Sequence, residues 1–347
     1  MQFVRNVWYP FAWDEEVGTG LFTRTLLGEP IVAYRKQDGR AVALEDTCPH
    51  RFAPLHMGKL VDDCVQCPYH GLTFESSGAC IRNPHGDGKI PTAAKVKNYP
   101  LVERDTLLWI WMGKPEEAKP DLIPDFSFLN NTEEFDYTSG NVMRMPLKLE
   151  LITDNLMDLT HAAYLHPTNL GSAAVAHGKM TVTQTGNTVL SQNLYPDGLP
   201  AAVFSMTGAC PPDKHVDYWV DVRWDPPGAM YFYAGVTPAG RPRSEGAQLS
   251  SAQLLAPESE STTHYFWKMY RNYQRNQPEL TAGIEAAVEQ AFSTEDEPMI
   301  AAVQQRMRGR DLWSMKPVLL STDGGAVRVR RLLEQMALAE AAQPASA

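Results

Sequence analysis

The 347-residue sequence predicts an α+β protein of two domains, an N-terminal all-β domain followed by a domain in which an antiparallel sheet wraps long helices. Three observations support this prediction. Short β-like runs separated by turn residues fill residues 7–111, and residues 113–125 are rich in proline and charge, as linkers are. Beyond them, alternating apolar runs are interspersed with helical patterns. We place the boundary near residue 120, which gives domains of 1–120 and 121–347.

The β-like runs of the first domain are short and bounded by turn residues. They lie at 30–34, 41–44, 72–74, 99–103 and 107–111. Between the first two runs, Asp38 and Gly39 favour the turn of a β-hairpin. Trp109 and Trp111 alternate with apolar neighbours, so we interpret both as core residues.

Two Cys-His pairs interrupt these strands, Cys48-Pro49-His50 and Cys67-Pro68-Tyr69-His70. Their spacing matches a Rieske 2Fe-2S cluster, in which two thiolates hold one iron and two imidazoles hold the other. The neutral imidazoles raise the potential from roughly −400 mV to about −150 to +300 mV, so a ferredoxin-type donor can reduce the cluster. A structural zinc site is the alternative, although zinc knuckles usually place the two cysteines together and the two histidines together.

The run at 48–55 resembles the first cluster loop of the Rieske non-haem iron oxygenases. Phe52 stands where that family usually has a glycine, which questions the local turn but not the ligands. Respiratory-chain Rieske proteins carry an additional disulfide-bonded cysteine in each loop, and the corresponding residues here are Ala53 and Tyr69. The resemblance therefore favours the oxygenase type, with Cys48, His50, Cys67 and His70 as cluster ligands.

Composition and charge exclude several partners. The net charge of −10 and the pI near 5.4 argue against nucleic acid or an anionic membrane surface. No run of eighteen apolar residues and no secretory signal is present, so we expect a cytoplasmic enzyme without membrane contact. We expect the remaining cysteines, Cys64, Cys80 and Cys210, to be reduced and mostly buried thiols.

A second group of candidate metal ligands opens the second domain. Helical spacing of the apolar residues places Asn155, Asp158 and His161 along one stripe of a helix. His166 lies about 140° further round, so it joins His161 only if the helix unwinds before Pro167. Two histidines and a distant carboxylate form the 2-His-1-carboxylate set of non-haem Fe(II). Alone, His-x4-His is a weak signal that more often represents two histidines on a helix surface, but the upstream cluster needs an electron acceptor.

The third ligand is predicted by the resemblance. Asp296 matches the family's carboxylate ligand, and Glu295 is its rival. The helical pattern at 280–292 should end or kink ahead of Pro298, which would present a carboxylate at a helix irregularity. The alternative is a solvated acidic cap on the following helix.

The rest of the second domain is predicted to be a sheet followed by a C-terminal helix. The strand-like runs lie at 181–183, 188–190, 218–224, 230–233, 248–255 and 263–270, and the helix at 327–341. By resemblance this is the helix-grip catalytic domain of the family. Gln253 is polar among apolar neighbours, so it either faces the substrate or occupies an exposed strand position.

Over most of its length the chain resembles the vanillate O-demethylase oxygenase component and related methyl-ether and methyl-group monooxygenases. Three stretches carry this resemblance, 154–166, 264–272 and 323–331. It implies a terminal oxygenase component that uses dioxygen for the O-demethylation of a vanillate-like methoxylated aromatic acid and releases formaldehyde. The alternatives are hydroxylation of an aryl methyl group, dealkylation of another small substrate, and, in another class, an electron-transfer Rieske protein.

The resemblance also implies cofactors and partners. Electrons from NAD(P)H would pass through a flavin- and ferredoxin-type reductase to the cluster and then to Fe(II) held by His161, His166 and Asp296. The family commonly forms a homotrimer, in which an aspartate links the cluster of one subunit to the iron of the next. Asp158 matches that aspartate, with its carboxylate expected to accept the imidazole N–H; a helix N-terminal charge is the alternative. Asn155 is expected to shape the sixth coordination position.

Overall fold

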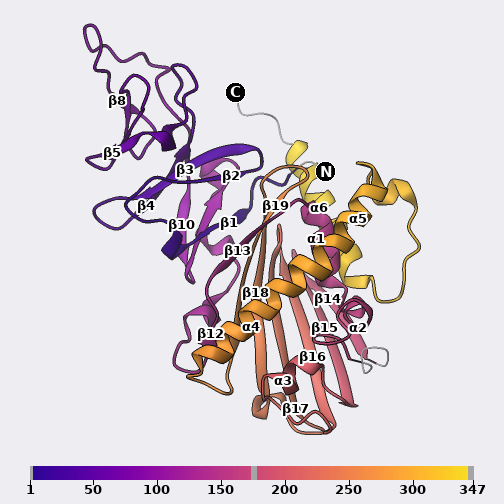
Figure 1. The fold of residues 1–347 in the computed structure, drawn as a ribbon. Coiled ribbons are helices and arrows are strands. Elements are labelled where there is room, and N and C mark those ends of the chain that lie inside the picture. Colours follow the sequence, from indigo (N-terminus) through magenta and orange to yellow (C-terminus); the bar gives the residue numbers. More distant parts are fainter. Residues whose placement is uncertain (1–2, 173–177, 343–347) are drawn as a thin grey trace. The chain divides into compact units, whose positions relative to one another are not determined.

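A computed structural model describes residues 3–172 and 178–342 (Figure 1). Contacts divide the described chain into two units. One unit comprises Arg5–Asp125 together with Glu258–Glu260, and the other comprises the remaining described residues. The division of contacts along the chain falls after Asp125, a few residues beyond the expected boundary.

The N-terminal unit contains three small antiparallel sheets (Figure 1). The first contains β1 (Trp8–Trp13), β11 (Leu107–Trp111) and β10 (Leu101–Arg104); the second β2 (Phe22–Leu26), β3 (Glu29–Arg35), β4 (Ala41–Glu45) and β9 (Asn98–Tyr99); the third β5 (Lys59–Val61), β6 (Cys64–Gln66), β7 (Thr73–Phe74) and β8 (Cys80–Arg82). Short 3-10 turns lie at Asp14–Glu16, Leu55–Met57, Pro115–Glu117 and Pro120–Leu122. β3 and β4 pair as the predicted hairpin, which confirms the turn at Asp38 and Gly39.

Tryptophans form much of the core of this unit. Trp8, Trp13, Trp109 and Trp111 are fully buried. The indole of Trp109 donates to the carbonyl of Arg104 at 3.2 Å, and both faces of β11 are buried. The interpretation of Trp109 and Trp111 as core residues is confirmed.

The C-terminal unit is built on one eight-stranded antiparallel sheet. Its strands are β12 (Asp136–Tyr137), β13 (Asn141–Met145), β14 (Lys179–Thr185), β15 (Thr188–Gly198), β16 (Val216–Asp225), β17 (Ala229–Pro238), β18 (Ala247–Pro257) and β19 (Thr263–Arg271). Successive strands from β14 to β19 are neighbours, and β12 and β13 both pair with β19. The six predicted runs are confirmed, whereas β12 and β13 were not predicted.

Six helices belong to the described part of this unit. They are α1 (Leu149–Met157), α2 (Ala162–Leu165), α3 (Ala202–Met206), α4 (Pro278–Ala291), α5 (Glu297–Met307) and α6 (Gly324–Ala341), with short 3-10 turns at Ser127–Asn130, Leu159–His161, Arg243–Glu245 and Trp313–Met315. The long helix α4, drawn in orange, crosses one face of the sheet and buries Ile284, Val288 and Ala291 (Figure 1). The α+β prediction with a helix-gripping antiparallel sheet is therefore confirmed.

The helix that carries the first metal-site residues is broken twice, not once. We expected one helix that unwinds ahead of Pro167, and the backbone does leave the helical region at His166, with φ −119° and ψ 47°. An additional break lies at Asp158, which is extended with φ −109° and ψ 96°. Its carboxylate accepts from the Thr160 amide at 2.9 Å, because a short acidic side chain competes locally with helical bonding.

Candidate metal centres and active site

The two loops that carry the Cys-His pairs have the same backbone construction. In each loop the cysteine amide donates to the carbonyl five residues further on, at 2.9 Å for Cys48 and 2.8 Å for Cys67. The cysteine carbonyl accepts from the amide four residues further on, at 2.9 Å and 3.1 Å respectively. The two loops thus present one cysteine and one histidine each in matched turns.

The fourth residue after each cysteine has a left-handed backbone. Gly71 has φ 72° in the second loop, and Phe52 has φ 58° at the equivalent position of the first. A phenylalanine in this region is strained, because its Cβ approaches the backbone carbonyl. The family's usual glycine is therefore missing, but the turn that it would favour is retained.

The four side chains fit a cluster with a buried and an exposed end. The cysteines Cys48 and Cys67 are 1% and 3% exposed. Burial raises the pKa of the Cys48 thiol to about 11, and the neighbouring Cys67 thiol adds to this rise. Two buried thiolates are unfavourable without a nearby positive charge, and a bound iron cation would stabilise them. The imidazoles of His50 and His70 lie side by side, with ring centroids 4.5 Å apart, and His50 is exposed.

Within residues 3–172 and 178–342, the one group of three or more potential metal ligands whose ligand atoms all lie within 4.8 Å of one another is His161, His166 and Asp296.

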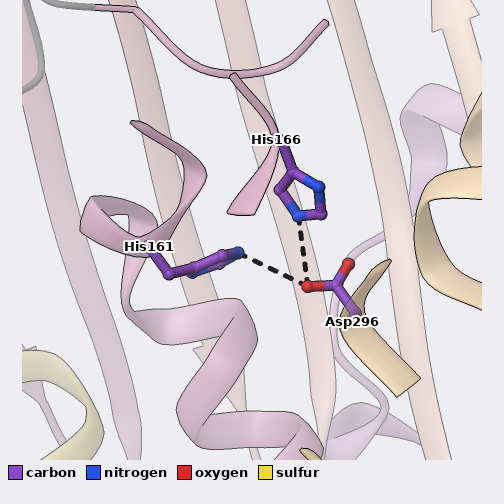
Figure 2. A group of neighbouring side chains, drawn as sticks. All are labelled: His161, His166 and Asp296. Carbon is purple, nitrogen blue, oxygen red and sulfur yellow. Dashed lines mark hydrogen bonds and ion pairs between the residues drawn. The ribbon is translucent and has the colours of Figure 1, made fainter. Parts of the chain in front are cut away.

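The three candidate iron ligands converge although they come from distant segments. His161 ends the 3-10 turn before α2, His166 follows α2, and Asp296 belongs to the helical segment before α5 (Figure 2). The Nε2 atoms of His161 and His166 face the same carboxylate oxygen of Asp296, at 3.6 Å and 3.1 Å. The structure therefore brings together the three residues that the sequence analysis singled out.

Hydrogen-bond partners decide which ring nitrogen of each histidine is open. Nδ1 of His161 faces the backbone carbonyl of Asp158, and Nδ1 of His166 faces the Glu295 carboxylate. Both partners can only accept, so each Nδ1 carries the hydrogen and each Nε2 presents a lone pair. Two lone pairs and a carboxylate oxygen repel one another unless a cation lies among them. The donor set fits an iron ion.

A proton can replace the cation in part when no metal is bound. Burial lowers the pKa of His166, but hydrogen bonds to Asp296 and then Glu295 raise it, and the net effect is a raised pKa. A raised pKa means that iron and protons compete for this imidazole.

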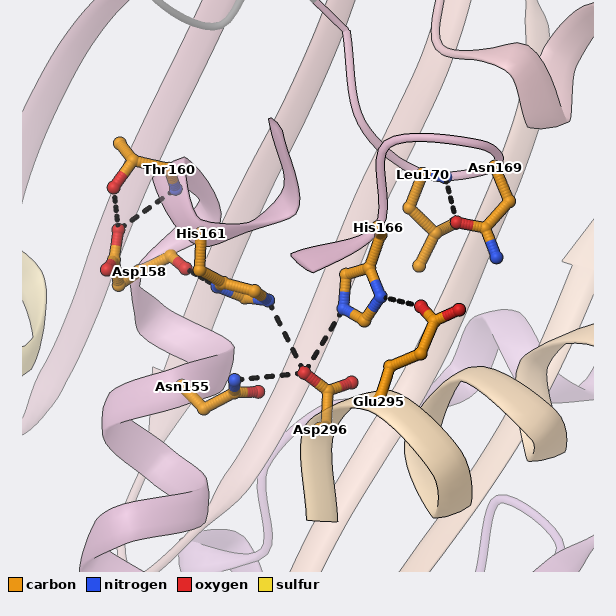
Figure 3. Close-up of polar contacts among 9 residues, drawn as sticks. All are labelled: Asn155, Asp158, Thr160, His161, His166, Asn169, Leu170, Glu295 and Asp296. Atoms are coloured by element: carbon orange, nitrogen blue, oxygen red, sulfur yellow. Dashed lines mark hydrogen bonds and ion pairs between the residues drawn. The ribbon is translucent and has the colours of Figure 1, made fainter. Parts of the chain in front are cut away.

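A π-helical segment places two consecutive carboxylates at the site. Residues Phe292–Asp296 form one wide turn between α4 and α5, which is the irregularity predicted ahead of Pro298. Asp296 is 3% exposed, which argues against the solvated-cap alternative, and Glu295 reaches the outer nitrogen of His166 (Figure 3). π-bulges frequently occur at functional sites. The role of Glu295 beside a ligand was not predicted; its position next to Asp296 was the only signal.

Asn155 and Asp158 contact the site in different ways. The amide of Asn155 donates to the Asp296 oxygen that faces both histidines, at 3.0 Å (Figure 3). The Asp158 carboxylate was expected to accept the imidazole N–H of His161, but it accepts from the backbone amide and hydroxyl of Thr160 instead. The backbone carbonyl of Asp158 is the partner of His161. The reason is the extended backbone at this residue, which turns its carboxylate onto the following turn.

An apolar pocket opens at the inner side of the triad. It has a volume of about 160 Å³ and is lined by the triad, by Asn155, and by residues of α4 and of strands β16 to β18. Gln253 is one of the lining residues and is 4% exposed, so the alternative of an exposed strand position is wrong. Both faces of β18 are buried along most of its length, which alternation in sequence could not show.

A small all-β domain with two matched Cys-His loops, together with a helix-gripped sheet that holds a His-His-Asp triad, defines a Rieske non-haem iron oxygenase. Family comparisons agree: residues 7–100 match the Rieske [2Fe-2S] domain, and 146–339 match the vanillate O-demethylase oxygenase C-terminal domain. The chain belongs to the vanillate O-demethylase oxygenase family.

Individual relatives extend over the whole chain. It is 37% identical to the oxygenase component of chloroacetanilide N-alkylformylase from Rhizorhabdus wittichii, with 97% of each chain covered. It is 38% identical to the oxygenase component of dicamba O-demethylase from Stenotrophomonas maltophilia, covering 99% of this chain and 100% of that one. A crystal structure of dicamba monooxygenase bound to 3,6-dichlorosalicylic acid superposes with a TM-score of 0.93 at 37% identity, over 99% and 100% of the two chains.

The chain is thus an oxygenase component of a Rieske monooxygenase system. Its cofactors are a Rieske 2Fe-2S cluster and non-haem iron, and its electrons come from a separate partner protein. The alternative of a pure electron carrier is excluded by this family membership. No helix among the described residues is long and apolar enough to cross a bilayer.

Proposed function

We propose that this oxygenase component carries out the oxidative O-demethylation of a methoxylated aromatic compound and releases formaldehyde. The observation that carries the proposal is the small apolar pocket of about 160 Å³ with His161, His166 and Asp296 in its wall. This volume suits a substrate of one substituted ring. Relatives named for vanillate and dicamba O-demethylation support the reaction class.

Each metal has a proposed set of ligands. Cys48, Cys67, His50 and His70 hold the 2Fe-2S cluster in the domain 1–120, and His161, His166 and Asp296 hold Fe(II) in the domain 121–347. When bound, the cluster supplies electrons and the iron supplies open positions for dioxygen beside the substrate.

The residues of this chain orient the ligands and keep the site dry. Glu295 and the Asp158 carbonyl hold the two imidazoles with Nε2 facing inward. Asn155 holds one oxygen of Asp296 and so restrains how that carboxylate binds. The apolar walls of the pocket exclude water from the reacting methyl group.

The proposed reaction balances with two electrons from the partner. One oxygen atom of O2 enters a C–H bond of the methoxy group, and the other leaves as water with two protons. The resulting hemiacetal then breaks its C–O bond to give a phenol and formaldehyde. A toluene-type methyl group would stop at the benzylic alcohol and release no formaldehyde.

The electrons are proposed to come from a flavin- and ferredoxin-type reductase that oxidises NAD(P)H, and to cross between subunits of a homotrimer at Asp158. Asp158 and His161 line a second hollow of about 310 Å³, bounded by α1, α5 and α6. Asp158 is not part of the apolar pocket, whereas His161 lines both. This hollow supports an approach to His161 that does not pass through the substrate pocket.

An arginine or histidine in the pocket would favour the aromatic acid expected from the sequence, but the two histidines of the lining are the proposed iron ligands His161 and His166. No lysine or arginine occurs among the described residues that line the pocket.

The test is turnover with NADH, a flavin- and ferredoxin-type reductase and a panel of methoxyarenes, methylarenes and N-alkyl anilides. Formaldehyde in proportion to the NADH oxidised, together with a phenol, is the expected result. A hydroxylated product without formaldehyde would refute O-demethylation and move the enzyme to methyl hydroxylation. Formaldehyde with an amide or amine product would assign N-dealkylation instead.

A further inference from the structure

Three residues outside the metal site contribute polar groups to the pocket lining, namely Tyr218, Ser251 and Gln253, among the residues that the structure describes. Ser251 and Gln253 lie two residues apart on β18, so their side chains point to the same face of the sheet. The rest of the lining is apolar apart from the triad and Asn155. Because the polar groups of the pocket are few, they determine which orientation of a substrate the pocket accepts.

A buried tyrosine fixes the direction of the Gln253 amide. The hydroxyl of Tyr265 donates to Oε1 of Gln253 at 2.5 Å, and Nε2 of Gln253 donates to the Ser251 hydroxyl at 2.8 Å. Burial, and then the charge of Asp296, raises the pKa of Tyr265 well above its usual value, so this hydroxyl remains a donor. The carbonyl end of the amide is thereby occupied.

What remains available at this point is a pair of donors. A glutamine amide has two N–H groups, and one of those of Gln253 is used by Ser251. The hydroxyl hydrogen of Ser251 is also free to turn, because its oxygen is the accepting atom in that bond. The second N–H and this O–H can both meet an acceptor atom of a substrate.

The pocket does not offer charge compensation for an anion. Its described lining has no lysine or arginine. The carboxylates of Asp296 and Glu295 both face His166, and together they would balance the charge of a divalent ion bound there. A carboxylate in such a pocket would lose its hydration and gain only the two neutral donors of Gln253 and Ser251, with no positive charge to compensate its own.

We infer that the substrate is an uncharged aromatic ether with a hydrogen-bond acceptor such as a carbonyl, and that Gln253, with Ser251, donates to this acceptor. The part of this inference that concerns the ether rests on the proposed demethylation, whereas the part that concerns the hydrogen-bond acceptor does not. Gln253 is therefore a determinant of substrate specificity, with Tyr265 acting through it as a positioning residue.

Three probes of nearly equal shape separate the parts of this inference. The first, 4-methoxyacetophenone, carries a neutral acceptor, and the second, 4-methoxybenzoate, carries a carboxylate. The third, 4-isopropylanisole, has no acceptor at that position. Binding to the iron-loaded holoenzyme is measured by calorimetry, and formaldehyde is measured with the reductase. We expect the ketone to bind about 2- to 10-fold more tightly than the hydrocarbon. We expect the benzoate to bind about 100-fold more weakly than the ketone.

Variants of the donor pair supply the second test. Gln253→Leu should remove the preference for the ketone over 4-isopropylanisole while leaving the affinity for the hydrocarbon within about twofold. If Gln253 had only a structural role, the variant would bind both probes more weakly by the same factor. Ser251→Ala, which leaves the Tyr265 bond intact, should reduce the same preference. Gln184→Leu makes the identical change on the exposed strand β14 and should change the affinity for neither probe.

The outcomes distinguish this inference from the proposed function. Benzoate binding as tightly as the ketone, or an unchanged ketone preference in Gln253→Leu, would overturn the inference whether or not formaldehyde forms. Selective ketone binding without formaldehyde would support the inference and refute O-demethylation.

Discussion

His166 is held on both sides of its ring, and this sets its function at the level of a single residue. Glu295 accepts from Nδ1, so Nε2 is the atom left for the metal, and it lies 3.1 Å from Asp296. A carboxylate on the outer nitrogen of a metal-binding histidine fixes the ring and raises its basicity. Glu295 is therefore expected to matter for iron binding without being a ligand.

Glu295→Gln should lower iron affinity by about 10- to 100-fold. In the native protein the raised pKa of His166 makes iron compete with a proton, so affinity should fall as the pH decreases through that pKa. Removing the charge lowers this pKa, so the decline should begin at a lower pH in the variant. Titration of the metal-free protein with Fe(II) at several pH values measures both effects.

Glu297→Gln is the matched control, since it changes a neighbouring carboxylate at the start of α5. It should leave iron affinity and its pH dependence unchanged. Equal behaviour of the two variants would contradict the role given to Glu295.

At the level of elements, two irregular segments determine the sites. The π-helical turn at Phe292–Asp296 lets two adjacent carboxylates reach one histidine pair. The left-handed residues Phe52 and Gly71 let the backbone of each cluster loop close on its cysteine, and Phe52 adopts this conformation although it is unfavourable for a residue with a Cβ. Strain of this kind is tolerated when the surrounding structure determines the conformation.

Phe52→Gly should stabilise the first cluster loop by about 0.5–1 kcal/mol, because glycine adopts φ 58° without strain and this gain exceeds its entropic cost. The Phe52 side chain is 77% exposed, so little packing is lost. The midpoint of thermal bleaching of the cluster absorption should rise.

Gly71→Ala provides the opposite change at the matched position of the second loop. A Cβ there would lie 3.1 Å from Pro84 at φ 72°, so the midpoint should fall. A lower midpoint in Phe52→Gly would show that the phenyl ring stabilises the loop by contacts that outweigh the strain.

At the level of the whole molecule, the two units are proposed to hold different metals, and each has its own core. The cysteines Cys48 and Cys67 belong to the core of the N-terminal unit, and Asp296 is buried in the C-terminal unit. Loss of one metal should therefore leave the other site intact.

His161→Ala should lose the mononuclear iron and retain the visible absorption of the cluster. It removes one of the three atoms that converge on the candidate iron position. Iron analysis together with the absorption spectrum checks the result. An undiminished iron content would refute the assignment of His161 as a ligand.

Asp158→Asn should keep both metals and lose most of the turnover. The asparagine oxygen can still accept from Thr160, and the backbone carbonyl that orients His161 is unchanged, so the fold should persist. Metal content and the rate of NADH-dependent product formation are measured side by side. Full activity at native iron content would exclude Asp158 from the electron relay.

The amino-acid sequence alone determined the features that depend on short spacings. The Cys-His pairs, the hairpin at Asp38 and the strands of both units follow from residues a few positions apart, where local geometry decides. The candidate ligands His161 and His166 also lie within one short segment. Asp296 came from the resemblance to a family and not from spacing.

Only the tertiary structure decided how distant segments meet. The partner of His161 is a backbone carbonyl, the partner of His166 is Glu295, and Gln253 is buried in the pocket. None of these contacts follows from periodicity, because a helix end at Asp158 and the burial of both faces of β18 depend on what packs against them. Local patterns specify which groups are available, and the packing of remote elements decides which of them face each other.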